Sequence, residues 1–185
     1  MKLNDKFIIK CKSSKCFSSV PFKESEFKTL KYKNPLFFFL HFWQQYEKFK
    51  VEYIEKNKKP PNNQFSGAAL GIILTYLFDR EGILIDKMDE KINGVPFVKP
   101  DFIIKSKSKN LFFISIKVSI RERWKQADWE AIKYKKKYPN ASCILLTNHK
   151  VELENLKKNL PQLDLDGAYY AGSDDINEMI RLIKS

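Results

Sequence analysis

The sequence predicts an α/β fold with an α+β leaning, in which helices cover both faces of a mixed β-sheet. The segment "PDFIIKSKSKNLFFISIKVSI", residues 100–120, contains two apolar runs joined by a turn of Ser, Lys and Asn, which is typical of a β-hairpin. After it, helical and apolar β-type segments alternate to the end of the chain, and such alternation predicts parallel strands joined by helices. Antiparallel and parallel pairing together make the sheet mixed.

The first part of the chain predicts an arm followed by two helices. Residues 1–35 are rich in Lys and Ser, and they are interpreted as a basic N-terminal arm with one short strand at 7–11. Aromatic residues then recur every three or four positions over 36–55, which predicts a helix. A second, apolar helix is expected over 67–78, with Ser66 as its N-cap.

The remaining elements follow from the same patterns. In chain order they are a strand at 83–86, two hairpin strands within 100–120, a helix at 122–138 that Pro139 stops, a strand at 142–148, a helix at 150–160, a strand at 166–172 and a helix at 174–185. A chain of 185 residues with 43% hydrophobic residues is sufficient for one core. We therefore expect residues 1–185 to form a single domain that includes the arm.

Charge and cysteine content narrow the expected partners and compartment. The chain carries 34 Lys and Arg against 22 Asp and Glu, a formal net charge of +12, which favours a polyanionic partner. Nucleic acid is the first expected partner and an acidic membrane surface the second. The alternative is that the positive charge reflects only a lysine-rich composition and no partner. Cys11, Cys16 and Cys143 are few and odd in number, which suits free thiols in a reducing cytoplasm. No apolar run reaches the ~18 residues that a membrane span needs.

Polar residues converge on the predicted hairpin. Alternation along its second strand places Ser115 and Lys117 on the same face as Phe113. Folding the hairpin about its turn brings Asp101 opposite the segment 115–117, where facing side chains lie about 5 Å apart. An acid and a lysine are therefore expected to meet on one face of a half-buried sheet, beside a hydroxyl that can bind a water or a ligand.

Glu130 is the second acid of this region. It stands two turns into the helix that follows the strand, on a polar stripe formed by Glu122, Gln126, Glu130, Lys133 and Lys137. Mg²⁺ prefers oxygen ligands and usually takes only one or two protein carboxylates, so Asp101 with Glu130 would suffice. The alternative is that Glu130 is an exposed helix charge that pairs with Lys133.

These residues resemble the motif of a known nuclease family. The "PD" at 100 and 101, the "SIK" at 115–117 and Glu130 after twelve intervening residues are similar to the PD-(D/E)XK nuclease superfamily. More narrowly, they resemble the EcoRII/SsoII/PspGI/NgoMIV-like branch of type II restriction endonucleases. In that branch Ser often replaces the acid before the lysine, and a helix Glu becomes a metal ligand. The resemblance covers about residues 66–185.

The resemblance implies a restriction-endonuclease-like core and Mg²⁺-dependent hydrolysis of phosphodiester bonds in double-stranded DNA at a short palindrome. It implies that Asp101 and Glu130 bind one or two Mg²⁺ ions per active site, and that Lys117 positions or deprotonates the attacking water. Cleavage of both strands of a palindrome implies a homodimer. A restriction enzyme also implies a prokaryotic, cytoplasmic location and a linked DNA methyltransferase that protects the host.

The run "KVSIRERWKQ", residues 117–126, is similar to the run with which that branch reads a CC:GG step. The resemblance assigns DNA recognition to Arg121, Glu122, Arg123, Lys125 and Gln126. The residue types suit this role, because Arg can bind O6 and N7 of guanine and Glu can accept from the amino group of cytosine. A solvated, charged helix start is the alternative.

Two departures from the family pattern leave other functions open. Gly71 stands where the preceding helix often carries an acid, and Glu55, Glu81 and Glu90 are unranked replacements. Ser115 stands where an acid is found in much of the superfamily. The alternatives are a repair or structure-specific nuclease of the same superfamily and a catalytically decayed DNA-binding module.

Overall fold

The computed structural model describes residues 4, 8, 22–61 and 63–185. The chain divides into two compact units, Met1–Gly82 and Ile83–Ser185. The strand expected at 7–11 lies almost entirely outside the described residues, and so do Cys11 and Cys16. No helix in the described part of the chain is long and apolar enough to cross a membrane.

The first unit contains three described helices. They are α2 (Glu24–Thr29), α3 (Pro35–Asn57) and α4 (Asn63–Arg80). α3 begins where the Asn34 side chain accepts a hydrogen bond from the Phe37 N–H at 2.9 Å. It ends at Lys58, whose left-handed backbone (φ 56°) turns the chain away. These boundaries confirm the helix predicted over 36–55.

α2 is a helix that the sequence analysis did not identify within residues 1–35. It places the ring of Phe27 against Phe42 of α3, at a centroid distance of 3.9 Å, and against Tyr76 of α4, at 4.1 Å. All three rings are fully or almost fully buried. α2 therefore contributes Phe27 to the core of this unit.

α4 is longer than predicted, and the N-cap assigned to Ser66 is wrong. The helix already begins at Asn63. The Ser66 hydroxyl instead forms a hydrogen bond with the hydroxyl of Tyr46 at 2.7 Å. The N-cap preference of Ser predicted a helix start that is too late, because the Ser66 side chain contacts α3 and does not cap α4.

The second unit is built on a five-stranded sheet. In spatial order the strands are β1 (Ile85–Met88), β2 (Phe102–Lys105), β3 (Leu111–Lys117), β4 (Ser142–Thr147) and β5 (Gly167–Tyr170). β1, β2 and β3 pair antiparallel, whereas β3, β4 and β5 pair parallel. The predicted hairpin and mixed sheet are therefore confirmed, and the pairing direction changes at β3.

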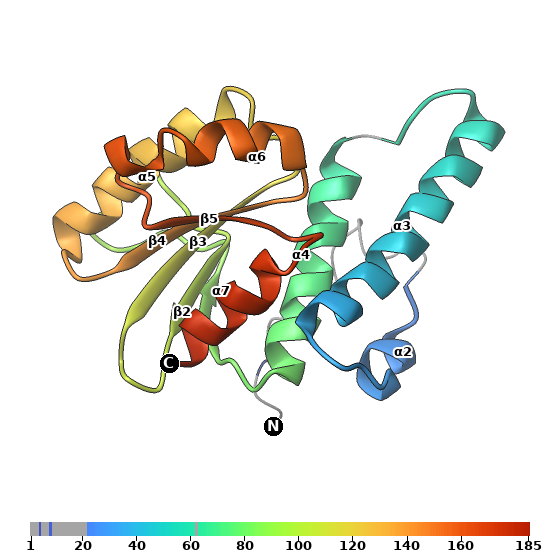
Figure 1. The fold of residues 1–185 in the computed structure, drawn as a ribbon, viewed down its shortest axis with the longest axis horizontal. Coiled ribbons are helices and arrows are strands. Elements are labelled where there is room, and N and C mark those ends of the chain that lie inside the picture. Colours follow the sequence, from blue (N-terminus) through green and yellow to red (C-terminus); the bar gives the residue numbers. More distant parts are fainter. Residues whose placement is uncertain (1–3, 5–7, 9–21, 62) are drawn as a thin grey trace. The chain divides into compact units, whose positions relative to one another are not determined.

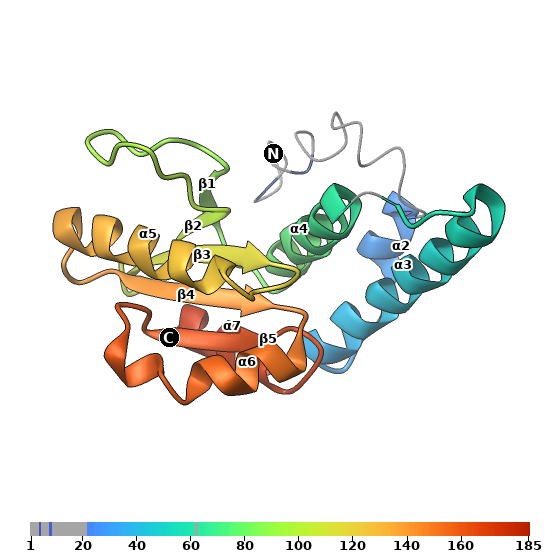
Figure 2. The ribbon, with the colours of Figure 1, turned by 90° about the horizontal axis from the view of Figure 1, so that it is seen from above.

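Helices cover both faces of this sheet, as predicted (Figure 1). α5 (Arg123–Lys137) and α6 (Lys150–Lys157) connect the parallel strands and lie on one face, while α7 (Asp175–Lys184) lies on the other. Figure 2 shows α5 running beside β3 and β4. Right-handed crossovers between neighbouring parallel strands place successive helices on the same face. A short 3₁₀ turn at Leu160–Gln162 follows α6.

Side chains of β3 alternate between the two faces and so position the site. Phe113 packs under α5, where its ring stacks on Tyr134 at a centroid distance of 4.4 Å. Ser115 and Lys117 follow at two-residue steps and share this face. They lie at the carboxyl end of β3, on the side of the sheet covered by the helix that carries Glu130.

Candidate active site

Asp101 and Lys117 lie side by side at the open end of the hairpin. The β2–β3 register pairs Phe102 with Ile114, which brings Asp101 level with the end of β3. The Ile116 N–H donates a hydrogen bond to Asp101 Oδ2 at 2.6 Å. Lys117 Nζ lies 3.9 Å from the same oxygen. The acid and the lysine therefore meet as the hairpin geometry predicts.

Glu130 belongs to the same cluster and is contributed by α5. The residue is only 5% exposed, and Gln126 donates a hydrogen bond from Nε2 to Glu130 Oε1 at 2.7 Å. The alternative of an exposed charge paired with Lys133 is therefore wrong. The charges of Lys117 and Asp101 both influence the ionisation of Glu130, so the three groups interact electrostatically.

Burial disfavours the charged form of both acids. It raises the pKa of Asp101, and the charge of Lys117 and the Ile116 N–H oppose this rise only in part. Burial also raises the pKa of Glu130, against the opposing effects of Lys117 and the Gln126 amide. A cation held by the two carboxylates would favour their charged forms, so the site is electrostatically suited to bind one.

Ser115 adds a buried hydroxyl beside Glu130. The residue is 7% exposed; among the described residues its Oγ makes no hydrogen bond of normal geometry, but its hydroxyl opposes the rise in the pKa of Glu130. A buried hydroxyl without a partner is costly unless a water or a ligand completes it. Two carboxylates and this hydroxyl form an oxygen-rich set of the kind that suits Mg²⁺, which takes few protein carboxylates and keeps several waters. The residues present therefore fit a hard divalent cation.

No third acid joins the two carboxylates in the part of the chain that the structure describes, since no group of three or more Asp, Glu, His or Cys side chains there could hold a metal ion. Glu55 and Glu81 belong to the first unit, and Glu90 is an exposed residue between β1 and β2. The sequence did not suggest Asp89. Its negative charge contributes to the raised pKa of Asp101, and its N–H donates to the Asp101 carbonyl oxygen at 3.2 Å.

The predicted recognition residues lie at the start of α5. The side chains of Arg121 and Glu122 are 85% and 82% exposed, and Arg123 is exposed as well. Lys125 pairs with Glu122 at 2.6 Å. Gln126 is exposed too, but its amide group donates to the buried acid of the same helix. Two arginines and a glutamate therefore face solvent within one short segment.

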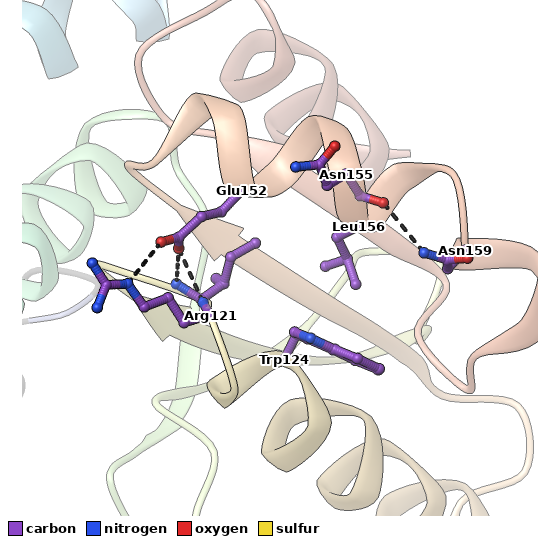
Figure 3. A pocket seen from close by; sticks show the side chains of 7 residues that line it. Arg121, Trp124, Glu152, Asn155, Leu156 and Asn159 are labelled. Carbon is purple, nitrogen blue, oxygen red and sulfur yellow. Dashed lines mark hydrogen bonds and ion pairs between the residues drawn. The ribbon is translucent and has the colours of Figure 1, made fainter.

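Glu152 of α6 holds the turn between β3 and α5, and sequence reasoning missed it. Its carboxylate accepts hydrogen bonds from the Ser119 hydroxyl at 3.1 Å, the Ile120 N–H at 2.6 Å and the Arg121 N–H at 3.0 Å. Arg121 Nε lies 3.4 Å from its other oxygen (Figure 3). Partial burial acts to raise the pKa of Glu152, but these hydrogen bonds outweigh it and lower the pKa. The sequence marks Glu152 only as an acid in the first turn of a helix.

The same region contains a surface pocket of about 240 Å³. Its lining residues are Ile120, Arg121, Trp124, Glu152, Asn155, Leu156 and Asn159. Figure 3 shows the indole of Trp124 opposite the α6 side chains. The turn that carries Arg121 therefore borders a hollow rather than a flat surface.

Comparisons with known proteins support the fold. No protein-family model matches the chain, and no curated protein matches it. Among solved structures, the chain is similar to one described as a complex of the restriction endonuclease PspGI with substrate DNA, with a TM-score of 0.53 and 17% sequence identity. The match covers 100% of this chain and 83% of that chain. The chain therefore has a restriction-endonuclease-like fold, as the sequence predicts.

Proposed function

We propose that the protein is a type II restriction endonuclease that hydrolyses phosphodiester bonds in double-stranded DNA in the presence of Mg²⁺. The observation that carries the proposal is the meeting of Asp101, Lys117 and Glu130 at the carboxyl end of β3. This grouping lies on a restriction-endonuclease-like fold, and the solved structure of similar fold is an enzyme bound to DNA. The net charge of +12 is consistent with a polyanionic substrate.

Each residue of the cluster has a distinct proposed role. Asp101 and Glu130 would hold Mg²⁺, which when bound polarises the phosphoryl group and lowers the pKa of a bound water. Lys117, whose side chain is only 12% exposed, would place a fixed positive charge or a proton acceptor beside the attacked phosphate. Ser115 would donate its hydroxyl to a water or a phosphate oxygen. Gln126 would orient the Glu130 carboxylate through its hydrogen bond.

Base recognition is proposed for the exposed start of α5. Arg121 and Arg123 offer donors that suit guanine, and Glu122 offers an acceptor that suits the amino group of cytosine. The resemblance of residues 117–126 to the run that reads a CC:GG step makes a short palindromic site with CC and GG steps the expected target. A palindrome is read symmetrically by two copies of the chain, so a homodimer is part of the proposal. A restriction role also entails a linked DNA methyltransferase and a prokaryotic cytoplasm.

A catalytically decayed DNA-binding module is the second candidate, and two observations favour it. Ser115 replaces a carboxylate, and within the described residues no third acid joins the cluster. Such a module would keep the net positive charge and bind DNA without cutting it. A structure-specific nuclease is less well supported, because an enzyme that reads shape has no need for the exposed Arg-Glu-Arg segment.

Digestion of a long, unmethylated linear DNA, with and without Mg²⁺, tests the proposal. The wild-type protein is expected to give discrete fragments only with Mg²⁺. Lys117→Ala is expected to lower the cleavage rate by at least ~100-fold, the effect typical of a lost proton-transfer group. Lys105→Ala is the matched control, since Lys105 is an exposed lysine at the other end of the hairpin.

The outcomes separate the candidate functions. Fragments with defined ends that need both Mg²⁺ and Lys117 support a sequence-specific nuclease. Intact DNA that is nevertheless bound supports the decayed module. Cutting of junctions or flaps, with linear duplex left intact, supports the structure-specific enzyme. Equal cleavage by the wild type and Lys117→Ala would show that the active site is assigned wrongly.

A further inference from the structure

The segment between β1 and β2 is a closed loop whose two ends meet at Asp101. The Asp89 N–H donates to the Asp101 carbonyl oxygen at 3.2 Å. The Asp89 side chain also pairs with Lys99 at 3.0 Å. The loop, residues 89–100, is therefore fastened to the backbone of the proposed metal ligand.

The inner side of this loop is anchored in the core. Ile92, Val95 and Val98 are 7%, 4% and 2% exposed, and they belong to the buried cluster beneath α5. The Val95 N–H donates to the Ile92 carbonyl oxygen at 3.0 Å, which closes a turn. Lys137 at the end of α5 donates to the carbonyl oxygen of Asn93. These contacts fix the position of the loop body.

Phe97 is the exception in this anchored loop. Its side chain is 92% exposed, the largest exposure of the large apolar side chains that the structure describes. Its backbone also lies in the left-handed region, with φ of 68°, which is rare for a bulky residue. Buried valines stand two residues before it and one residue after it. The loop therefore holds an aromatic ring in solvent in a strained conformation, a combination that suggests a binding role.

The position of Phe97 limits what the ring can contact. Phe97 stands four positions before Asp101, so the two Cα atoms lie at most about 14 Å apart. The major groove of B-DNA is about 12 Å wide. The distance from Phe97 to Asp101 is therefore at most about the width of one groove of a duplex whose phosphodiester lies at Asp101.

We propose that Phe97 enters a groove of bound duplex DNA and makes an apolar contact with sugars and base edges beside the cleaved phosphate. The inference rests on the proposed function for the place of the DNA. DNA is favoured over a second copy of the chain because the loop is fastened to Asp101 and the chain carries a net charge of +12. A single exposed ring is also small for a dimer interface, which requires a large buried area.

The test compares Phe97→Asn with Phe97→Tyr. Asn tolerates the left-handed backbone but lacks the ring, whereas Tyr keeps the ring. Leu182→Asn is the control, because Leu182 is a 41% exposed apolar residue on α7. The dissociation constant for duplex DNA is measured by fluorescence anisotropy with Ca²⁺ in place of Mg²⁺, over a series of salt concentrations, and the melting temperature of each variant is recorded.

Phe97→Asn is expected to weaken DNA binding about tenfold, while Phe97→Tyr and Leu182→Asn bind as the wild type does. The dependence of affinity on salt should keep its slope, because the ring contacts no phosphate. The melting temperature of Phe97→Asn should equal or exceed that of the wild type, since the strain is relieved. Weaker DNA binding together with unchanged or higher stability supports the inference.

Other outcomes overturn the inference or the proposed function separately. Wild-type affinity of Phe97→Asn overturns the inference even if the wild type cuts DNA. A wild type that binds DNA without cutting it overturns the nuclease, and the Phe97 comparison still decides the inference. If Phe97→Asn dissociates a dimer but each site binds DNA as before, the ring contacts a second copy and the inference is wrong. A wild type that binds no duplex DNA overturns both.

Discussion

Glu130 is expected to lower the folding stability of the metal-free protein and to favour the binding of a cation. Its carboxylate is buried, and its pKa is raised by that burial. A buried, ionised carboxylate lowers the free energy of unfolding. Binding of a cation or a proton removes this cost. The site is therefore expected to be a local weakness of the metal-free protein, and the metal is expected to remove it.

Glu130→Gln is predicted to stabilise the metal-free protein and to abolish cleavage. Since the folded-state pKa is raised, the cost to stability grows as the pH rises through the unfolded-state pKa and is complete above the folded-state pKa, and it vanishes below about pH 4, where both states are protonated. The variant should gain on the order of 1 kcal/mol in the free energy of unfolding at pH 8 and nothing at low pH. Urea titrations at the two pH values measure the difference.

Mg²⁺ supplies the control for this prediction. It should raise the melting temperature of the wild type and leave that of Glu130→Gln unchanged, because only the wild type keeps both carboxylates. Equal stabilisation of the two proteins by Mg²⁺ would contradict the role of Glu130 as a ligand. Equal unfolding free energies at pH 8 would contradict the buried charge.

At the scale of elements, the turn between β3 and α5 joins the proposed chemistry to the proposed recognition. It begins directly after Lys117 and ends at Arg123, the first residue of α5. α6 fixes it through Glu152, which accepts from two consecutive backbone N–H groups, those of Ile120 and Arg121. The spacing between the strand that carries Lys117 and the start of α5 thus depends on a third element.

Glu152→Ala is predicted to loosen this turn. Loss of hydrogen bonds to a charged group should lower the free energy of unfolding by about 1–3 kcal/mol. Because the pKa of Glu152 is lowered in the folded protein, this stabilisation is present above the unfolded-state pKa and disappears as the pH falls through the folded-state value. Faster hydrogen exchange at the Ile120 and Arg121 amides is the direct readout.

The exposed Glu154 of the same helix gives the control for this variant. Its side chain is 60% exposed and forms an ion pair with Lys150 on the surface of α6, so Glu154→Ala should leave the exchange rates unchanged. Unaltered amide protection in Glu152→Ala would refute the role of the carboxylate in holding the turn.

The hairpin could be predicted from the sequence because the residues that determine it are close together in the chain. One turn and a two-residue period fix which side chains of β3 share a face, and Asp101 and Lys117 meet accordingly. The orientation of Glu130 depends on how α5 docks on β3, which helical periodicity leaves open. Glu152 contacts a turn more than thirty residues away, and no local pattern reports such a pair. The same limit explains the wrong cap at Ser66, which contacts another helix.

At the scale of the whole molecule, one proposed active site per chain raises the question of how two DNA strands are cut. The cluster of Asp101, Lys117 and Glu130 occurs once in the sequence and can attack one phosphodiester at a time. Two-fold symmetry of a dimer would present one cluster to each strand of a palindrome. Double-strand cleavage should therefore require two intact chains.

Mixed dimers test this requirement. An equimolar mixture of wild type and Lys117→Ala, allowed to exchange subunits, is predicted to accumulate nicked circles from a supercoiled plasmid that carries one site. The wild type alone should produce mainly linear DNA. Agarose gels taken over time distinguish the two products. Linear DNA from the mixture without an excess of nicked circles would mean that a single site cuts both strands in turn.

The change of pairing direction at β3 has a consequence for how this protein can evolve. β3 is paired on both sides, with β2 and with β4, and it carries Lys117 at its end. The amides of its central residues are expected to exchange only on global unfolding, so a mutation that disturbs its pairing also endangers the fold. The residues at 121–123 and Phe97 are exposed, so replacing their side chains disturbs no buried packing. Under the proposed function, target preference can therefore drift through these outer positions while selection for a folded protein preserves the strand that carries Lys117.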